Sequence, residues 1–100
     1  MTKNRNSKQY DLEDRTLEFA RRVIAFVNRL PKTLPNHEVA KQLVKSSGSV
    51  GANYIEANEA LSKKDFAMRI KICRKESKES RYWLQLVKVK PEGDEKEKNH

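Results

Sequence analysis

The sequence predicts an all-α protein, an antiparallel up-and-down bundle of three long helices. Two stretches, residues 43–61 and 66–87, repeat apolar or small residues at alternating intervals of four and three. This spacing is typical of a helix packed lengthwise on other helices. A third stretch, residues 12–30, also repeats apolar residues at helical spacing. No alternation of the kind found in strands is long enough to compete with this prediction.

The first helix is predicted to start at Asp11 or a near neighbour and to end before Pro31. Acidic residues at its start suit the positive N-terminal end of the helix dipole. The residue before a proline is pushed out of helical geometry, so Pro31 stops the helix. The loop that follows, residues 32–35, is short, and short loops join antiparallel helices.

The second helix is predicted to start after Asn36, its N-cap, and to run to about Leu61. Gly48 and Gly51 in its middle each cost about 1 kcal/mol relative to alanine. Two interpretations follow: a break that gives two shorter helices, or a continuous helix whose small residues let a neighbouring backbone approach closely. The uninterrupted phase from Leu43 to Leu61 favours the continuous helix.

Residues 62–90 are predicted to form one long third helix. Ser62 is its expected N-cap, and the Asp65 carboxylate completes a capping box. Because Leu61 leads directly into this cap, we expect a tight hairpin between the second and third helices. A seam of seven apolar or small positions is expected to face the other helices: Phe66, Ile70, Cys73, Ser77, Ser80, Leu84 and Val87.

The composition indicates one small domain. The chain has 100 residues, 36% of them hydrophobic and 36% charged, which is lean for a monomer that folds alone. We expect a helical domain over residues 10–90, between a disordered basic tail, residues 1–9, and a disordered charged tail, residues 91–100. Cys73 has no partner for a disulfide, and no segment resembles a signal peptide or membrane span. These features predict a cytoplasmic protein with no membrane partner.

The third helix also carries most of the charge. The net charge is +8, and residues 62–90 hold ten Lys or Arg against three acids, so this helix accounts for +7. A basic stripe can follow a phosphate backbone, and a tyrosine within it can stack on a base. The alternative is a solvated face, which charge runs usually are. We expect Glu76 and Glu79 to point away from the stripe, which favours binding. The predicted nucleic-acid-binding residues are Lys64, Lys71, Arg74, Lys75, Lys78, Arg81 and Tyr82.

Other kinds of chemistry find little support in the sequence. No histidine lies near the glutamate pairs that resemble carboxylate metal ligands, so we expect ion pairs with Lys or Arg instead. These pairs are Glu56 with Glu59 and Glu76 with Glu79. Cys73 is expected to pack as a small apolar residue. The glycines follow no strand and lack the Lys-Ser/Thr of a phosphate-binding loop. We therefore predict no enzymatic activity, no cofactor, no metal and no small-molecule substrate.

Three segments together resemble a known family. Residues 49–57, 62–66 and 72–80 are similar, in this order, to the bacterial four-helix-bundle proteins, also called 23S rRNA intervening-sequence proteins. The resemblance covers about residues 10–89. Two departures stand out. Ala57 replaces a glycine that often follows the glutamate matching Glu56, and a charged tail stands where the family has a fourth helix.

The resemblance implies an antiparallel helix bundle, here with its fourth helix missing, that assembles into ring-like homopentamers. It also implies a relation to the accessory proteins of diversity-generating retroelements, which are basic and bind nucleic acid and a reverse transcriptase.

The leading prediction for function is RNA or DNA binding, with RNA preferred, through phosphate contacts of the third helix. The alternative is a homo-oligomeric adaptor that binds a protein partner such as a reverse transcriptase. In either case the three helices leave apolar surface where a fourth would lie, so we expect self-association. Trp83 and Ile72 are the predicted interface residues. Ile72 belongs to the apolar surface that the other helices cannot cover, and Trp83 is a large aromatic side chain with one polar group, which suits an interface.

Overall fold

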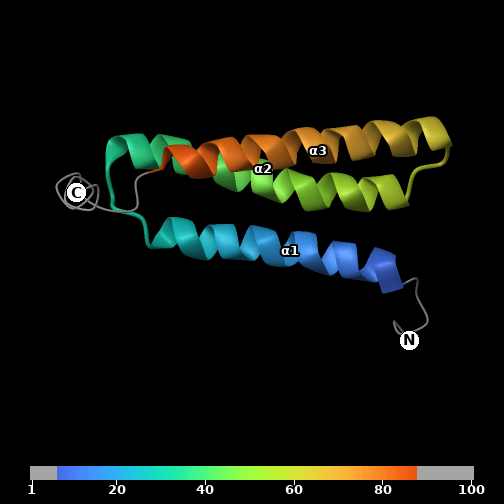
Figure 1. The fold of residues 1–100 in the computed structure, drawn as a ribbon, viewed down its shortest axis with the longest axis horizontal. Helices are drawn as coiled ribbons and strands as arrows, with labels where there is room; N and C mark the ends of the chain where they lie inside the picture. The colour runs from blue at the N-terminus through green and yellow to red at the C-terminus, as the bar shows by residue number, and fades with distance from the viewer. Residues whose placement is uncertain (1–6, 88–100) are drawn as a thin grey trace, which may run out of the picture.

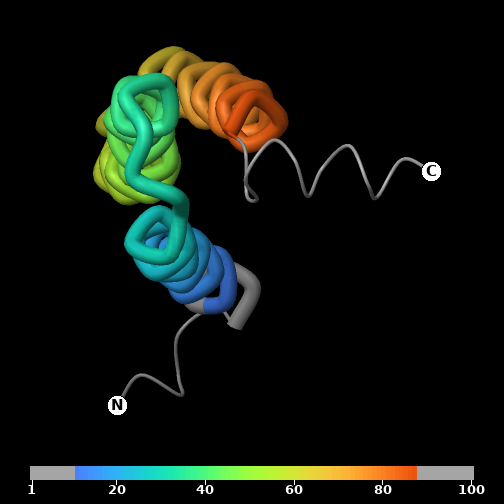
Figure 2. Tube along the Cα trace, turned by 90° about the vertical axis from the view of Figure 1, so that its left-hand side faces the viewer, coloured from blue at the N-terminus to red at the C-terminus, as the bar shows by residue number. Residues whose placement is uncertain are grey.

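Three antiparallel helices make up the fold in this computed structural model, which describes residues 7–87. The helix α1 spans Ser7–Asn28, α2 spans Leu34–Asn58 and α3 spans Lys63–Leu86 (Figure 1). The end view in Figure 2 shows the three helices as an arc with α2 in the middle. Both α1 and α3 pack on α2 and have little direct contact with each other. The predicted all-α, up-and-down arrangement is therefore confirmed.

Helix α1 begins at Ser7, four residues before the predicted start at Asp11. Asp11 therefore lies inside the helix and is not its cap, and its carboxylate pairs with Arg15 one turn later at 3.0 Å. At the other end, the N–H groups of Arg29 and Leu30 donate to carbonyls three residues earlier and close the last turn. The helix therefore ends just before Pro31, as predicted.

The N-cap of α2 is Thr33, so the prediction of Asn36 was wrong. The Asn36 N–H donates to the Thr33 hydroxyl at 3.2 Å, which makes Asn36 the third residue of the helix. Pro35 lies in the first turn, where its missing N–H costs nothing. The Asn36 side chain is buried and donates to the Pro31 carbonyl at 3.2 Å, tying the loop to the helix.

Helix α2 is continuous through Gly48 and Gly51, so the prediction of an unbroken helix is confirmed. A Cβ added at Gly51 would lie 3.1 Å from the Thr16 Oγ1 of α1, whereas one added at Gly48 meets nothing within 4 Å. The close approach that we expected at these glycines therefore occurs at Gly51. Farther along the same contact, the Asn58 amide donates to Glu13 at 2.9 Å.

The hairpin between α2 and α3 is looser than predicted. Helix α2 ends at Asn58, with Glu59 as its C-cap, rather than near Leu61. Leu61 is 98% exposed, so it takes no part in the packing seam. Ser62 is the N-cap of α3, as predicted, and its hydroxyl accepts the Asp65 N–H at 3.1 Å. Residues 60–61 are therefore needed to turn the chain between two capped helices.

Small polar contacts connect α3 to α2. The hydroxyls of Ser46 and Ser80 lie 2.9 Å apart, and both residues are buried. The Cys73 thiol donates to the Val50 carbonyl at 3.4 Å. At the α2–α3 hairpin end, Arg69 donates to the Asn53 side chain at 3.0 Å. These contacts place the α2-facing side of α3 along Arg69, Cys73 and Ser80.

The predicted seam of α3 is only partly buried. Ser80 and Val87 are buried and Cys73 is half-buried, but Phe66 is 45% exposed and Ser77 is exposed. The prediction for Phe66 and Ser77 was wrong because, among the described residues, α3 packs mainly on α2, which leaves one side of its seam uncovered by the other helices. The helix ends at Leu86, and the predicted extension to Lys90 lies outside the described residues.

The apolar core is small. The buried apolar residues in the described part of the chain are Val23, Leu30, Ala40, Leu43, Val50, Ala57 and Val87. Many larger apolar side chains stay 38–51% exposed on all three helices: Leu12, Leu17, Ile24, Val44, Ile55, Phe66, Met68 and Leu86. Between residues 7 and 87, no helix combines the length and the hydropathy that crossing a membrane requires.

Candidate nucleic-acid interface

Four of the predicted phosphate-binding side chains line a single hollow on α3. The hollow is formed by Lys71, Arg74, Lys75 and Lys78, all of which are exposed. Because successive residues of an α-helix are rotated by about 100°, these positions lie opposite the side that contacts α2. We call the outward side of α3 that bears them the basic face. The structure therefore brings together four of the six predicted cations.

The remaining predicted residues extend the basic face along the helix. Lys64 lies two turns before the hollow and is exposed, and Arg81 lies just after it and is exposed. With a rise of 1.5 Å per residue, the cations from Lys64 to Arg81 extend over about 26 Å. Tyr82 is 57% exposed and follows one turn after Lys78. All seven predicted residues are therefore accessible on one helix.

One acid lies closer to the basic face than expected. The Glu76 carboxylate is 3.9 Å from the Lys75 ammonium, although its side chain is only 18% exposed and lies toward the α2 side. The prediction that Glu76 points away was therefore only partly right, because the flexible lysine side chain reaches around the helix to its neighbour. An exposed pair of this length contributes little to stability, so Lys75 remains available to a stronger anion.

Tyr82 and Trp83 form an aromatic pair. Their ring centroids are 5.1 Å apart and the rings are inclined by 69°, an edge-to-face arrangement. Trp83 and Ile72, the predicted interface residues, are both half-buried within the single chain. Other apolar side chains are more exposed, among them Phe66 on α3 and Ile55 on α2. In the sequence, the signal for an interface was that the chain has more apolar side chains than three helices can cover.

A separate apolar hollow of about 360 Å³ lies between α1 and α2. Leu17 and Ile55 line it, about half exposed, and Gly48, Gly51 and Ala52 are also among its lining residues. Glu13 and Asp14 add two carboxylates at its edge. This surface does not include any residue of α3, so it is distinct from the basic face.

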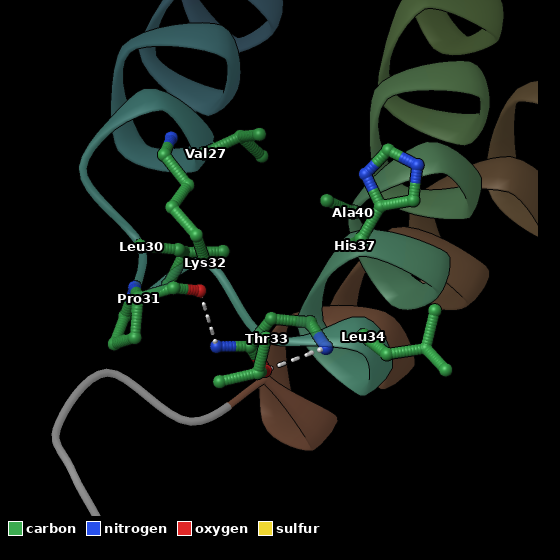
Figure 3. A pocket seen from close by; sticks show the side chains of 9 residues that line it. Val27, Leu30, Pro31, Lys32, Thr33, Leu34, His37 and Ala40 are labelled. Carbon is green, nitrogen blue, oxygen red and sulfur yellow. Dashed lines mark hydrogen bonds between the residues drawn. The ribbon is translucent and has the colours of Figure 1, made fainter.

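Another hollow, of about 370 Å³, lies where α1 connects to α2 (Figure 3). Val27, Leu30 and Ala40 make much of its lining apolar, and Lys32 and His37 add two polar side chains. None of these residues was predicted to be functional. The only sequence feature that marks the position of this hollow is the proline-bounded loop between the two helices.

Cys73 behaves as the packing residue that was predicted. It is half-buried against α2, and burial raises the pKa of its thiol above the ordinary value. Among the described residues, no group of three or more His, Cys, Asp or Glu side chains is placed to hold a metal ion.

The comparison with known proteins agrees with the resemblance found in the sequence. A family model described as 23S rRNA-intervening sequence protein matches residues 8–99, nearly the whole chain. No curated protein and no solved structure matches the chain. The matched range includes α2, α3 with its basic face, and all of α1 except Ser7. The chain belongs to the 23S rRNA-intervening sequence protein family.

Proposed function

We propose that this protein binds nucleic acid through the basic face of α3, by contacts to phosphates and with little reading of the base sequence. The observation that carries the proposal is the hollow lined by Lys71, Arg74, Lys75 and Lys78, whose lining residues include no acid. A phosphate placed there would meet several cations at once, and such charge-assisted contacts are the strongest that surface side chains offer.

The same hollow is hard to explain as a merely solvated surface. From Lys71 to Lys78 four cations lie within about 10 Å along the helix axis. Like charges three or four residues apart destabilise a helix by a few tenths of a kcal/mol per pair. Here Lys71 repels both Arg74 and Lys75, and Lys78 repels both as well. A bound polyanion would reduce this repulsion, so the helix should be more stable with a polyanion bound than without one.

RNA is the nucleic acid to test first. The family is described by an intervening sequence of 23S rRNA, which gives a reason to prefer RNA that the charge alone does not supply. A cytoplasmic location fits this proposal, because a lone thiol such as Cys73 stays reduced there.

Salt dependence of binding tests the proposal. Fluorescence anisotropy of a labelled RNA should show an affinity that falls steeply between about 50 and 200 mM salt. A variant with all four hollow cations changed to glutamine should lose up to about 2.8 from the log–log slope on a single strand, at about 0.7 per phosphate contact. These changes are Lys71→Gln, Arg74→Gln, Lys75→Gln and Lys78→Gln.

A second variant with the same change in net charge provides the control. It replaces four exposed cations outside α3: Arg21→Gln, Arg29→Gln, Lys41→Gln and Lys45→Gln. The control should keep the slope of the original protein, and circular dichroism should show equal helicity in all three proteins. Equal losses in both variants would mean that net charge, and not the basic face, determines binding. No binding by the original protein would refute the proposal.

Self-association is a second proposed property, and it also serves the alternative role of an adaptor. The observation in its favour is the exposed apolar surface of the three helices. This surface includes the hollow between α1 and α2, which Leu17 and Ile55 line. Apolar patches on a soluble protein usually mark an interface. The homopentamer implied by the family resemblance is the expected state.

Sedimentation velocity at micromolar concentration tests this property. The double change Leu17→Ser and Ile55→Ser should shift the protein toward the 11.7 kDa monomer without opening the core, because both side chains are already half exposed. Leu61→Ser is the matched control, since Leu61 is 98% exposed in the loop. A single species at monomer mass for the unaltered protein would exclude self-association.

A further inference from the structure

We infer that the basic face of α3 takes single-stranded nucleic acid, with one unpaired base stacked on Tyr82. This inference rests on the proposed nucleic-acid binding and narrows it to one form of the partner. Three observations support it: the exposure of the Tyr82 ring, the position of that ring among the cations, and the distribution of charge around α3.

The Tyr82 ring is available for stacking. It is 57% exposed, more than any other large apolar or aromatic side chain on α3. Its edge-to-face contact with Trp83, at 5.1 Å, restrains the orientation of the ring without covering it by a parallel partner. An exposed aromatic face held in place is the element on which proteins stack successive bases of a single strand.

The position of Tyr82 matches the path of a phosphate backbone. At about 100° per residue, Lys71, Lys75 and Lys78 fall within an arc of about 60°, and Tyr82 falls inside this arc. A strand that follows the three lysines along the helix therefore reaches the ring next. The exposed Gln85, about one turn beyond Tyr82, adds an amide that can bond a base edge.

The charge around α3 does not suit a duplex. A helix that enters the major groove, which is about 12 Å wide, faces phosphates on both walls and needs cations on both flanks. Here Arg74 and Arg81 extend the lysine arc toward one side, whereas the exposed Glu79 lies toward the other. A duplex would bring one wall of phosphates against this acid. In addition, paired bases are stacked inside a duplex and cannot reach Tyr82.

The experiment compares four labelled probes of one unstructured sequence, about 16 nucleotides long to match the upper site size of single-strand binders. The probes are single-stranded RNA, single-stranded DNA, and the RNA and DNA duplexes, and anisotropy is measured with the full chain. We expect both single strands to bind more tightly than either duplex. The RNA and DNA arms show whether the 2′-hydroxyl contributes.

Variants of Tyr82 test the stacking contact itself. Tyr82→Leu should weaken single-strand binding by about 5- to 150-fold, the range for loss of one stacked base, with an unchanged salt slope. Tyr82→Phe keeps the ring and should restore most of the affinity. On the duplexes both variants should bind like the original protein. Quenching of Trp83 fluorescence by a single strand, reduced in Tyr82→Leu, would give a readout independent of affinity.

The outcomes separate this inference from the proposed function. Equal binding of single strands and duplexes, or full affinity of Tyr82→Leu for single strands, would overturn the inference and leave phosphate binding intact. Absence of salt-dependent binding to all four probes would overturn both. Loss of affinity in Tyr82→Phe equal to that in Tyr82→Leu would also overturn stacking, since it would place the effect on the hydroxyl group.

Discussion

The two glycines of α2 provide a matched test of how closely α1 and α2 pack. Gly48 and Gly51 lie in the same helix, three residues apart, and neither has a positive φ, so alanine suits the backbone at both. Replacing a helical glycine with alanine gains about 1 kcal/mol of helix propensity. The two positions differ in their surroundings: a Cβ at Gly48 meets nothing, and a Cβ at Gly51 meets Thr16.

We therefore expect Gly48→Ala to stabilise the protein and Gly51→Ala not to do so. The first should stabilise the fold by about 1 kcal/mol, which for a domain of this size raises Tm by about 4–8 °C. The second gains the same propensity but places its Cβ 3.1 Å from Oγ1 and 3.3 Å from Cβ of Thr16. Overpacking costs about 1–3 kcal/mol, so the net effect runs from neutral to destabilising by about 2 kcal/mol.

Thr16 has little room to move away. Its hydroxyl donates to the Glu13 carbonyl at 3.0 Å, and its β-branched side chain is restricted at χ1. The clash must therefore be relieved by separating α1 from α2, unless the threonine is shortened. The double variant Thr16→Ala with Gly51→Ala removes the nearest atom, so a double-mutant cycle should show a favourable coupling of about 0.5–3 kcal/mol.

Urea unfolding followed by circular dichroism measures these differences, at one protein concentration because self-association shifts apparent stability. The reasoning would be refuted if Gly51→Ala stabilised the protein as much as Gly48→Ala. That result would mean that α1 does not approach α2 at Thr16. A destabilising Gly48→Ala with weaker self-association would instead show that a neighbouring copy occupies the space beside Gly48.

Two further predictions concern α3. Ser62→Ala should destabilise the fold by about 1 kcal/mol through loss of the N-cap bond to the Asp65 N–H, and thermal unfolding at fixed concentration measures it; an unchanged Tm would mean that this bond contributes nothing. Alkylation of Cys73 by iodoacetamide should be slower than that of the urea-unfolded chain at a pH below the ordinary thiol pKa, because burial raises the pKa and lowers the thiolate fraction. The difference between the two rates should narrow as the pH rises above the folded pKa, and equal rates throughout would contradict the burial of this thiol.

The existence and order of the helices followed from the sequence because periodicity, Pro31 and the Ser62 cap are local signals. The N-cap of α2 did not, because Thr33 and Asn36 are both good capping residues and lie only three positions apart. Pro35 decides between them, since a proline is accepted in the first turn of a helix. The prediction of Asn36 placed Pro35 in the loop, whereas Pro35 lies in the first turn of α2.

Exposure was harder to predict than secondary structure. The same spacing places Phe66 and Ser80 on one seam, yet Ser80 is fully buried and Phe66 is 45% exposed. Periodicity shows which residues share a side of a helix, but the number of neighbours that cover this side is a tertiary property. The cations of the basic face were predictable for the opposite reason, because residues on one helix keep their mutual positions wherever the helix packs.

The arc of helices has a consequence for how the chain opens. Helix α1 contacts the rest of the described structure almost entirely through α2, whereas the pair of α2 and α3 has its own buried contact at Ser46 and Ser80. Detachment of α1 therefore disrupts one interface and leaves the other intact, which defines a partly open form below the energy of global unfolding. Amide protons of α1 should exchange through this form first. An α1 released in this way uncovers the α2 surface around Gly51, where the same helix from another copy would fit, so the arc lends itself to exchange of α1 between chains.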